Sequence, residues 1–539
     1  MRNKKLQVWL PLILSICMIA GMFIGYRIRG NMPNTGIFFT NRPKPVQEVM
    51  DLIQREYVDK ENEDSLSNIA IQSMLARLDP HSVLLPPQEL ESVNEDLEGQ
   101  FYGIGIEFNI FNDTINVLNV LQNSPSDKAG LHVGDKFLKV GDSTIAGVHI
   151  TSEQIKKLLR GPGGSTVNIL ISRNGKQLRI PITRGMIPLY SLDAAYMIAD
   201  TVGYIRLNKF SETTYDEFMT AAQNLKKKGM KSMILDLRDN GGGILTEATN
   251  IADEFLDKDK LITYTVGEHS PKKEYRCSKP GIFETGKLVV LANEGTASAS
   301  EILIGALQDW DRATIIGRRT FGKGLVQEQF QLSDGSGLRL TIARYYTPLG
   351  RSIQKSYKDG IEAYNQDLMN RFHNGEMSFA DSIKHTNEKE YKTASGKLVF
   401  GGGGITPNVF VPYDTTSFDR QIARVYLSGT LSNFVYINYL NNEKQFDAYK
   451  TPADFEKNYS VDPSTLSNFK NYAAKDSITF SIDSPSEKSQ LEKQIKTLTA
   501  RQIWRTQGLY EVNNATDETV QKALQVIKGN NAIPEPVNK

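Results

Sequence analysis

The apolar and polar positions of the first hundred residues predict one long apolar helix and two amphipathic helices. An apolar run extends over residues 8–26, which is close to the roughly 20 residues that cross a bilayer. After a linker at 30–42, two helical stripes follow, Val46, Val49, Ile53 and Tyr57, and then Leu66, Ile69, Ala70, Met74 and Leu78. We expect a linker and helical segment at 30–95 whose helices pack and carry no chemistry.

The rest of the chain divides into three segments by the same pattern. Residues 96–186 hold short strand-like runs and form a separate unit. Residues 187–412 alternate buried-type strand runs with amphipathic helices, which is typical of an α/β domain. Residues 413–539 show apolar residues at helical spacing and no readable motif, so packing or self-association into a homo-oligomer is their expected role. The predicted fold class is multidomain α/β, or α+β, with N-terminal helices and a C-terminal helical region.

Length, charge and cysteine content narrow the classes of function. The 539 residues have room for several domains and a substantial core. The net charge is +1 and charged residues are mixed throughout, so the sequence gives no electrostatic case for nucleic acid binding. With two cysteines, Cys17 and Cys277, we expect no disulfide framework and no Cys/His zinc site. No motif indicates a cofactor.

Residues 1–29 are a membrane anchor or a signal peptide. Basic residues precede the apolar run, and no Ala-x-Ala-like cleavage site follows it. Ile16, before Cys17, is bulky where a lipoprotein signal has a small residue. We favour an uncleaved single-pass anchor in the inner (cytoplasmic) membrane. Because a short basic N-terminus normally stays in the cytoplasm, the body of the protein is expected on the periplasmic or extracytoplasmic side.

One strand-turn-helix stretch places a serine at the start of a helix. Residues 288–291 form a buried-type strand, small residues then break it, and helical spacing resumes over 299–307. Ser298 therefore lies where unpaired N–H groups and the positive end of the helix dipole collect. It is either an ordinary helix N-cap or a nucleophile. Thr296 and Ser300 are neighbouring hydroxyls that spacing alone does not exclude.

A base for such a nucleophile lies downstream, and the six histidines are scattered away from this stretch. Lys323 is flanked by Gly322 and Gly324, which lets the backbone bend sharply and pack closely. A lysine acts as a base only if burial lowers its pKa from about 10.4 towards neutrality, and neighbouring apolar side chains could supply that burial. Ser-Lys dyads are a known alternative to Ser-His-Asp triads.

These stretches resemble a known family. Asn-Glu-Gly-Thr-Ala-Ser-Ala-Ser-Glu-Ile-Leu at 293–303 and Thr-Phe-Gly-Lys-Gly-Leu-Val-Gln at 320–327 are similar to the catalytic segment of the C-terminal processing peptidases, also called tail-specific proteases. The resemblance implies a crotonase/ClpP-like protease core. It also implies that Ser298 is the nucleophile, Lys323 the general base and Gln327 the residue that orients the lysine. Glu301, one turn after Ser298, is implied to be a positioning group.

Three successive glycines follow the predicted strand at 233–237. Gly241, Gly242 and Gly243 can turn backbone N–H groups towards one point, as an oxyanion hole requires, or they can form a flexible loop. The family carries a matching Leu-Arg-x-Asn-x-Gly-Gly pattern. The resemblance therefore implies an oxyanion donor among the three glycines, with the Ala299 N–H as the second donor.

Residues 96–186 resemble a PDZ domain. The Ala-Gly-Leu-x-x-Gly-Asp run at 129–135 is its marker. The loop formed by Tyr102, Gly103, Ile104 and Gly105 matches the one that holds a peptide's terminal carboxylate with backbone N–H groups. The resemblance thus implies protein substrates with free C-termini as partners. For Arg160 we favour a plain surface arginine, with a role in carrying a signal between this domain and the protease as the alternative.

The family pattern is interrupted at about 356–398 by polar residues, which we expect to form a surface excursion. His81 is assigned no catalytic role. The sequence as a whole predicts a membrane-anchored serine endopeptidase that binds protein C-termini through its PDZ domain and cleaves near them by a Ser-Lys mechanism. A catalytically idle adaptor and a crotonase-like acyl-CoA enzyme are the alternatives. The intact trio of Ser298, Lys323 and Gln327 argues against the first, and the anchor and PDZ domain against the second.

Overall fold

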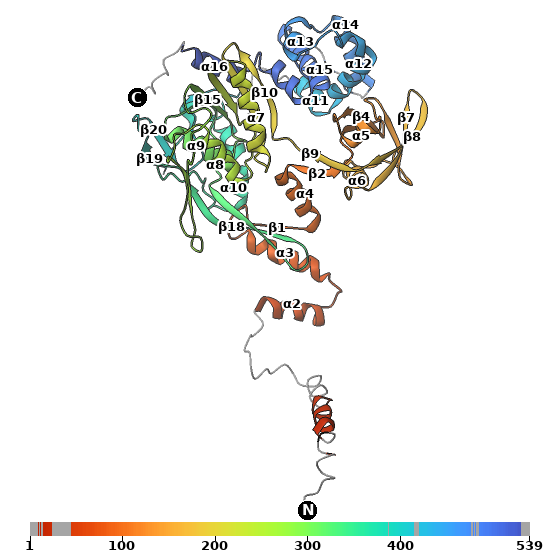
Figure 1. The fold of residues 1–539 in the computed structure, drawn as a ribbon, viewed down its shortest axis with the longest axis vertical. Helices are drawn as coiled ribbons and strands as arrows, with labels where there is room; N and C mark the ends of the chain where they lie inside the picture. Colours follow the sequence, from red (N-terminus) through yellow and green to blue (C-terminus); the bar gives the residue numbers. More distant parts are fainter. Residues whose placement is uncertain are drawn as a thin grey trace, which may run out of the picture. The chain divides into compact units, whose positions relative to one another are not determined.

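The computed structural model describes residues 9, 11, 14–23, 45–385, 388–413, 420–475, 478, 480 and 484–529 (Figure 1). The chain divides into two compact units, residues 1–73 and 74–539. The linker predicted at 30–42 and most of the apolar run at 8–26 lie outside the described residues. In the described ranges, no helix is both long and apolar enough to cross a membrane.

In the first unit, helices occupy the stretches where two amphipathic helices are predicted. These are α2 (Pro45–Glu56) and α3 (Glu63–Leu75), whose last two residues belong to the second unit. No residue of α2 is buried. The stripe residues Val46 and Val49 are each more than half exposed, so the packing predicted for this stripe is absent from the described structure of the unit.

The PDZ segment forms a sheet of six strands around its own core. The strand order is β3 (Ile106–Phe111), β4 (Thr114–Val120), β5 (Lys136–Val140), β7 (Thr166–Arg173) and β8 (Lys176–Thr183), with β6 (Ser143–Thr144) beside β5. Helices α5 (Pro125–Lys128) and α6 (Ser152–Leu159) accompany the sheet. Ile115, Phe137 and Ile155 are completely buried in this core. Strand β3 lies at the edge of the sheet, directly after the predicted carboxylate loop.

The protease core is built on a second sheet of six strands, in which all strands but β10 run parallel. Its order is β10 (Leu192–Ala199), β11 (Val202–Leu207), β12 (Ser232–Asp236), β15 (Lys287–Ala292), β16 (Thr314–Gly317) and β21 (Val409–Phe410). Because parallel sheets are covered on both faces, their strands read as continuous apolar runs. The runs at 233–237 and 288–291 have this origin.

Alternate residues of these strands belong to two different cores. Leu235 and Val290 pack with helices α7 (Thr214–Lys227), α8 (Leu245–Asp253) and α9 (Ala299–Asp309). Ile234 and Leu291 pack instead with α16 (Glu518–Lys528). A helix from the far end of the chain is therefore an integral layer of the catalytic domain.

A third sheet carries the lysine segment. Its order is β1 (Val83–Leu85), β18 (Gly337–Tyr346), β13 (Leu261–Val266) and β14 (Lys273–Arg276), and β17 (Leu325–Gln331) also pairs with β18. Short strands β2 (Gln100–Gly103) and β9 (Gly185–Pro188) pair where the chain enters and leaves the PDZ segment, and α4 (Pro87–Glu98) precedes them. Lys323 lies just before β17.

Most described residues of the insertion at 356–398 are exposed or partly exposed, as expected for a surface excursion, but the segment has regular secondary structure and buries several polar side chains. It contains α10 (Ile361–His373), a 3₁₀ turn (Ala380–Ser382) and β19 (Lys389–Lys392), and it ends at the first residue of β20 (Leu398–Gly401). Tyr364, Arg371 and Glu376 are each at most 5% exposed. These three side chains can be buried because ion pairs and hydrogen bonds satisfy their polar groups.

The C-terminal helical region has two parts. Helices α11 (Arg420–Leu427), α12 (Thr430–Phe446), α13 (Pro452–Asn458) and α14 (Pro463–Lys475) share an apolar core with the first half of α15 (Pro485–Asn513) (Figure 1). Helix α15 is kinked at Trp504 and Arg505. Beyond the kink it joins the protease, where Gln507 Oε1 accepts a hydrogen bond from the Ala195 N–H at 3.0 Å.

Candidate active site

Ser298 occupies the turn between β15 and α9 in an unusual conformation. Its φ of 56° and ψ of −117° differ from the extended conformation of a normal N-cap. Non-glycine residues rarely adopt such angles, and where they persist the surrounding structure enforces them, most often at functional sites. The two neighbouring hydroxyls are buried and occupied: Thr296 donates to the Leu237 carbonyl at 2.8 Å, and Ser300 to the Asn240 carbonyl at 3.0 Å.

A groove of about 900 Å³ brings the predicted site residues together. It is lined, among others, by Ser298, Ala299, Lys323, Gln327, Gly241, Gly242 and Gly243. These residues come from three separate stretches of the chain and meet in one place. In the part of the chain that the structure describes, no cluster of His, Cys, Asp or Glu is arranged to hold a metal ion.

The Lys323 side chain is held by a relay of hydrogen bonds. Its Nζ donates to Gln327 Oε1 at 2.9 Å, and Gln327 Nε2 donates to the main-chain carbonyl of His81 at 2.6 Å. Because the amide nitrogen is committed to His81, the amide oxygen faces the lysine. His81 thus contributes a backbone carbonyl to the site, a role that sequence reasoning missed.

The environment of Lys323 lowers its pKa, as a general base requires. Burial is the main cause, and the positive charge of Arg339, which also lines the groove, adds to it. The carboxylates of Glu301 and Asp79 act in the opposite direction. The net effect favours the neutral amine more than in an exposed lysine.

Glu301 is fully buried below the groove and joins the serine turn to the lysine turn. Its carboxylate accepts hydrogen bonds from the main-chain N–H groups of Ser298 at 2.9 Å, Gly322 at 2.7 Å and Lys323 at 2.8 Å. The Thr320 hydroxyl donates a fourth, at 2.5 Å. Burial raises the Glu301 pKa to about 7, although these hydrogen bonds oppose the shift. All four contacts hold the two turns in place, which is the geometry of a positioning group.

The glycine loop lies directly against the serine. A Cβ on Gly242, whose φ is +98°, would come within 2.7 Å of Ser298 Cβ and 2.9 Å of the Ala299 nitrogen. A Cβ on Gly243 would approach the Phe210 carbonyl oxygen to 2.1 Å. Close approach therefore explains these two glycines, whereas Gly241 has open space around it. The Gly242 N–H donates to Asn240 Oδ1 at 2.9 Å, so an oxyanion at Gly242 would compete with that bond.

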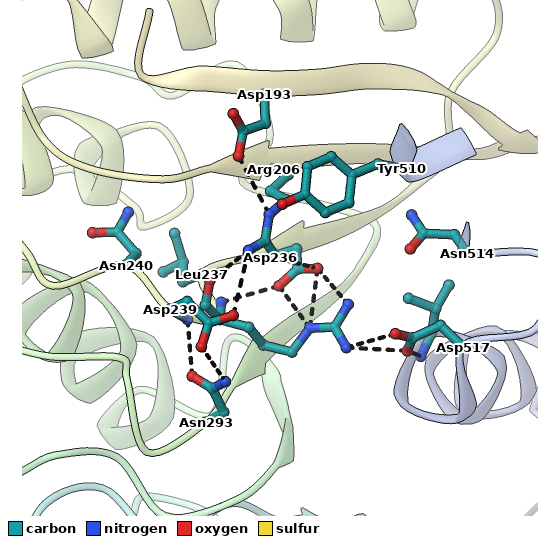
Figure 2. Close-up of polar contacts among 12 residues, drawn as sticks. Asp193, Arg206, Asp236, Leu237, Asp239, Asn240, Asn293, Tyr510, Asn514 and Asp517 are labelled. Atoms are coloured by element: carbon teal, nitrogen blue, oxygen red, sulfur yellow. Dashed lines mark hydrogen bonds and ion pairs between the residues drawn. The ribbon is translucent and has the colours of Figure 1, made fainter. Parts of the chain in front are cut away.

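A network of charged residues lies next to Asp239 and Asn240, which lead into the glycine loop (Figure 2). The Asp236 carboxylate is fully buried between Arg206, at 3.1 Å, and Arg238, at 2.7 Å. Burial alone would raise the pKa of Asp236, but the two guanidinium groups outweigh it and hold the pKa well below its ordinary value. Arg238 also pairs with Asp517, which lies at the start of α16, at 2.9 Å.

The same network reaches the turn that carries the serine. In Figure 2, Asn293 lies beside Asp239 and the two residues are joined by two hydrogen bonds. The Asp239 N–H donates to Asn293 Oδ1 at 2.9 Å, and Asn293 Nδ2 donates to Asp239 Oδ1 at 2.7 Å. The glycine loop and the serine turn are thus linked through Asp239 and Asn293, which are not among the residues that line the groove.

The predicted carboxylate loop leads into the edge strand of the PDZ sheet. Gly105 has a φ of +79°, and a Cβ there would come within 2.4 Å of Ser124 Cβ, so the position requires glycine. Among the described residues, no carbonyl accepts a hydrogen bond from the N–H groups of Ile104 and Gly105. Such free N–H groups beside an unpaired edge suit an added peptide strand.

Arg160 is more than a plain surface arginine. It forms an ion pair with Glu95 of α4 and lies over the ring of Phe101, with its guanidinium carbon 4.4 Å from the ring centroid. It therefore connects the end of the PDZ helix α6 to the segment that leads into the domain.

Family models and relatives agree with this architecture. The model of peptidase family S41 matches residues 201–363, that of the PDZ domain 103–183, and that of a family of unknown function, DUF8443, 422–505. A carboxy-terminal-processing protease of Bartonella bacilliformis is 35% identical over 313 residues, which cover 57% of this chain and 71% of that protein. The chain belongs to peptidase family S41. The resemblance to C-terminal processing peptidases is thereby confirmed, as are the α/β fold class and the PDZ domain.

Two further similarities extend to other S41 peptidases. A probable CtpA-like serine protease of Staphylococcus haemolyticus is 33% identical over 359 residues, covering 65% of this chain and 72% of the relative. Among solved structures, a photosystem II D1 C-terminal processing protease is 30% identical; the match covers 57% of this chain and 89% of that one, with a TM-score of 0.33. This S41 peptidase is therefore an enzyme, and the comparisons favour neither the adaptor nor the acyl-CoA alternative.

Proposed function

We propose that this S41 peptidase cleaves proteins near free C-termini, with Ser298 as nucleophile and Lys323 as general base. The observation that carries the proposal is the relay from Lys323 through Gln327 to the His81 carbonyl, in the groove that Ser298 lines. A solvated lysine needs no such relay. Here the relay directs the amine, and burial lowers its pKa.

Each residue has a defined task in the reaction. The Ser298 hydroxyl attacks the scissile carbonyl while neutral Lys323 takes its proton, which produces a tetrahedral oxyanion. N–H groups of Ala299 and the glycine loop stabilise that oxyanion. The lysine then passes the proton to the leaving amine, and the acyl group stays on Ser298. A water molecule, deprotonated in turn by Lys323, hydrolyses the acyl-enzyme.

The PDZ domain supplies the preference for protein ends. The N–H groups of Ile104 and Gly105 would hold a terminal carboxylate, while the peptide backbone pairs with the free edge of β3. Capture of the tail there raises the local concentration of the nearby chain at Ser298. The name of the Bartonella relative, carboxy-terminal-processing protease, supports this interpretation.

We further propose that the apolar run at 8–26 anchors the enzyme in the inner membrane, with the protease on the periplasmic or extracytoplasmic side. The length of the run and its basic N-terminal flank support this proposal. Alkaline extraction of membranes tests it, because a chain held by a spanning helix stays in the pellet. Release of the intact chain into the supernatant would contradict it.

The proposed specificity is tested by one cleavable peptide made with a free and with an amidated C-terminus. The full chain, purified in detergent, should cleave the free acid faster at the same bond, because amidation removes the anion that the loop N–H groups bind. Mass spectrometry identifies the products, and the Ser298→Ala variant measures the background. Equal rates for the two peptides would refute C-terminal recognition and leave the Ser-Lys chemistry standing.

A further inference from the structure

The helix α10 of the insertion contacts the turn that presents Lys323. Arg371 is 3% exposed, and its guanidinium donates to the Thr320 carbonyl at 2.8 Å and the Phe321 carbonyl at 3.3 Å. It also donates to the carbonyl of Gly403 at 3.2 Å. Buried carbonyls that lose their donors incur a desolvation cost. Arg371 therefore fixes the backbone immediately before Gly322 and Lys323.

Ion pairs with carboxylates of the insertion hold both Arg371 and Arg319, which lies just before the lysine turn. Asp367 lies 3.0 Å from Arg371 Nε, and Arg319 makes two hydrogen bonds of 2.7 Å to Glu376. Both carboxylates belong to the insertion. Two arginines thus attach the lysine turn to the insertion: Arg319 belongs to the segment before the turn, and Arg371 belongs to the insertion.

A second side chain of α10, Tyr364, contacts His81, the residue at the far end of the hydrogen-bond relay from Lys323. Tyr364 is 3% exposed, and its hydroxyl lies 2.7 Å from His81 Nε2. Burial is the main reason that the pKa of His81 falls to about 4, so this ring is neutral at physiological pH. The contact with Tyr364 holds the His81 side chain in position. The main-chain carbonyl of the same residue accepts the hydrogen bond from Gln327.

Lys355 lies between the lysine turn and α10. Its Nζ lies over the rings of Phe321 and Tyr364, 3.9 Å and 4.1 Å from their centroids. It also donates to Asp367 Oδ2 at 3.1 Å. Phe321 on the lysine turn and Tyr364 on α10 therefore pack around the same cation. This contact joins the two segments.

We infer that α10 is a positioning element of the catalytic apparatus, in which Arg371 sets the turn of Lys323 and Tyr364 sets the His81 segment that orients Gln327. The inference rests on the proposed role of Lys323 as the base. Displacement of a reacting group by about 1 Å can cost on the order of a hundredfold in rate. Loosening of the turn would also admit water around Lys323 and let its pKa rise towards the ordinary value.

The test compares variants on opposite faces of α10. Arg371→Gln removes the charge and most of the donors, Arg371→Lys keeps the charge, and Tyr364→Phe removes a single hydroxyl. Gln366→Ala, on the exposed face of the same helix, is the matched control. For each full-length variant we would measure kcat and KM against pH on a cleavable peptide. The rates are corrected for the active fraction, which is titrated with a serine-directed phosphonate.

For Arg371→Gln we expect kcat at pH 7 to fall about ten- to a hundredfold with little change in KM. The acid limb of its kcat profile should move to higher pH, so that part of the loss is recovered in alkaline solution. Arg371→Lys should restore part of the rate. Tyr364→Phe should lose about tenfold or less, as for one hydrogen bond, and Gln366→Ala should match the parent.

A purely structural role would lower the active fraction and leave the corrected kcat and the pH profile unchanged, and that result would overturn the inference. If Arg371→Gln does not fold, Tyr364→Phe decides in the same way, because it preserves the packing of the ring. Lys323→Ala separates the two proposals. If that variant keeps the parental kcat, the proposed function itself fails, whatever the α10 variants show.

Discussion

The Glu301 carboxylate accepts a hydrogen bond from the main-chain N–H of Lys323, at 2.8 Å, and through its other bonds holds the Ser298 turn as well. One buried side chain thus fixes the Ser298 turn and the Lys323 turn relative to each other. Since all four of its contacts are with donors, an amide at this position would turn its NH₂ group towards at least one N–H group.

Glu301→Gln should therefore destabilise the fold by about 1–3 kcal/mol and lower kcat. The carboxyl also predicts a pH dependence. Its pKa is raised from 4.5 to about 7 in the folded state, so the folded chain binds more protons than the unfolded chain between these values, and this contribution to stability is lost as pH rises through that window. Melting temperatures across this range should show this loss in the parent and not in Glu301→Gln. Parallel curves would contradict the assignment.

The choice of nucleophile is tested by two alanine substitutions. Ser298→Ala should abolish turnover and leave the melting temperature nearly unchanged. Ser300→Ala should retain much of the activity, because its hydroxyl is bonded to the Asn240 carbonyl inside the fold, and should cost about 1 kcal/mol of stability. Peptide hydrolysis and thermal melts of both variants provide the measurement. The opposite pattern would reassign the nucleophile.

Removal of the proposed base, Lys323, should cost orders of magnitude in rate. We expect this loss from Lys323→Ala and not from any single histidine substitution. His81→Ala is the strictest control, because it keeps the main-chain carbonyl that Gln327 binds and removes only the ring. A loss in His81→Ala as large as that in Lys323→Ala would speak against the Ser-Lys assignment.

Arg339 provides a test with a defined sign. Its positive charge lowers the pKa of Lys323, so Arg339→Gln should raise that pKa. The acid limb of the kcat/KM profile should then move to higher pH, since more of the lysine is protonated at a given pH. A limb that stays in place or moves to lower pH would show that Arg339 does not tune the base.

The ion pair between Arg238 and Asp517 should contribute to both stability and catalysis. Asp517 also caps α16 by accepting a hydrogen bond from the Val520 N–H at 2.9 Å. Asp517→Ser keeps a capping oxygen and loses the charge, whereas Asp517→Ala loses both. We expect each lost interaction to cost about 1 kcal/mol, with kcat reduced in both variants because Arg238 leads into the glycine loop. Denaturant melts that show equal stability for the parent and both variants would refute the role.

Features carried by neighbouring residues could be predicted from the sequence. The strand before Ser298, the break in it, and the Gly-Lys-Gly turn are local patterns, and their chemistry follows from a few adjacent side chains. The family resemblance then distinguished Ser298 from Thr296 and Ser300. The structure adds a physical distinction, because the hydroxyls of the other two are occupied inside the fold.

Features that depend on distant pairings could not be predicted in this way. The sequence predicts Arg371 and Glu376 at the surface because charged residues usually lie there. In the structure Arg371 bonds to Thr320 and Glu376 to Arg319, and each of these partners is more than fifty residues away in the sequence. His81 meets Gln327 across 246 residues, and Arg238 meets Asp517 across 279. Composition does not distinguish a solvated charge from a paired, buried one.

The position of α16 in the catalytic domain has a consequence for the synthesis of the protein. Helix α16 follows every strand of the six-stranded sheet along the chain, and its Val520, Ala523 and Ile527 cover one face of that sheet. While the ribosome is still translating the helical region between the last strand and α16, that face of the sheet is not yet covered. Arg238 also lacks its ion-pair partner Asp517 during this time. The nascent chain therefore contains Ser298 and Lys323 before the ion pair between Arg238 and Asp517, next to the glycine loop, can form. This order of events would delay proteolytic activity until the last part of the core has been made.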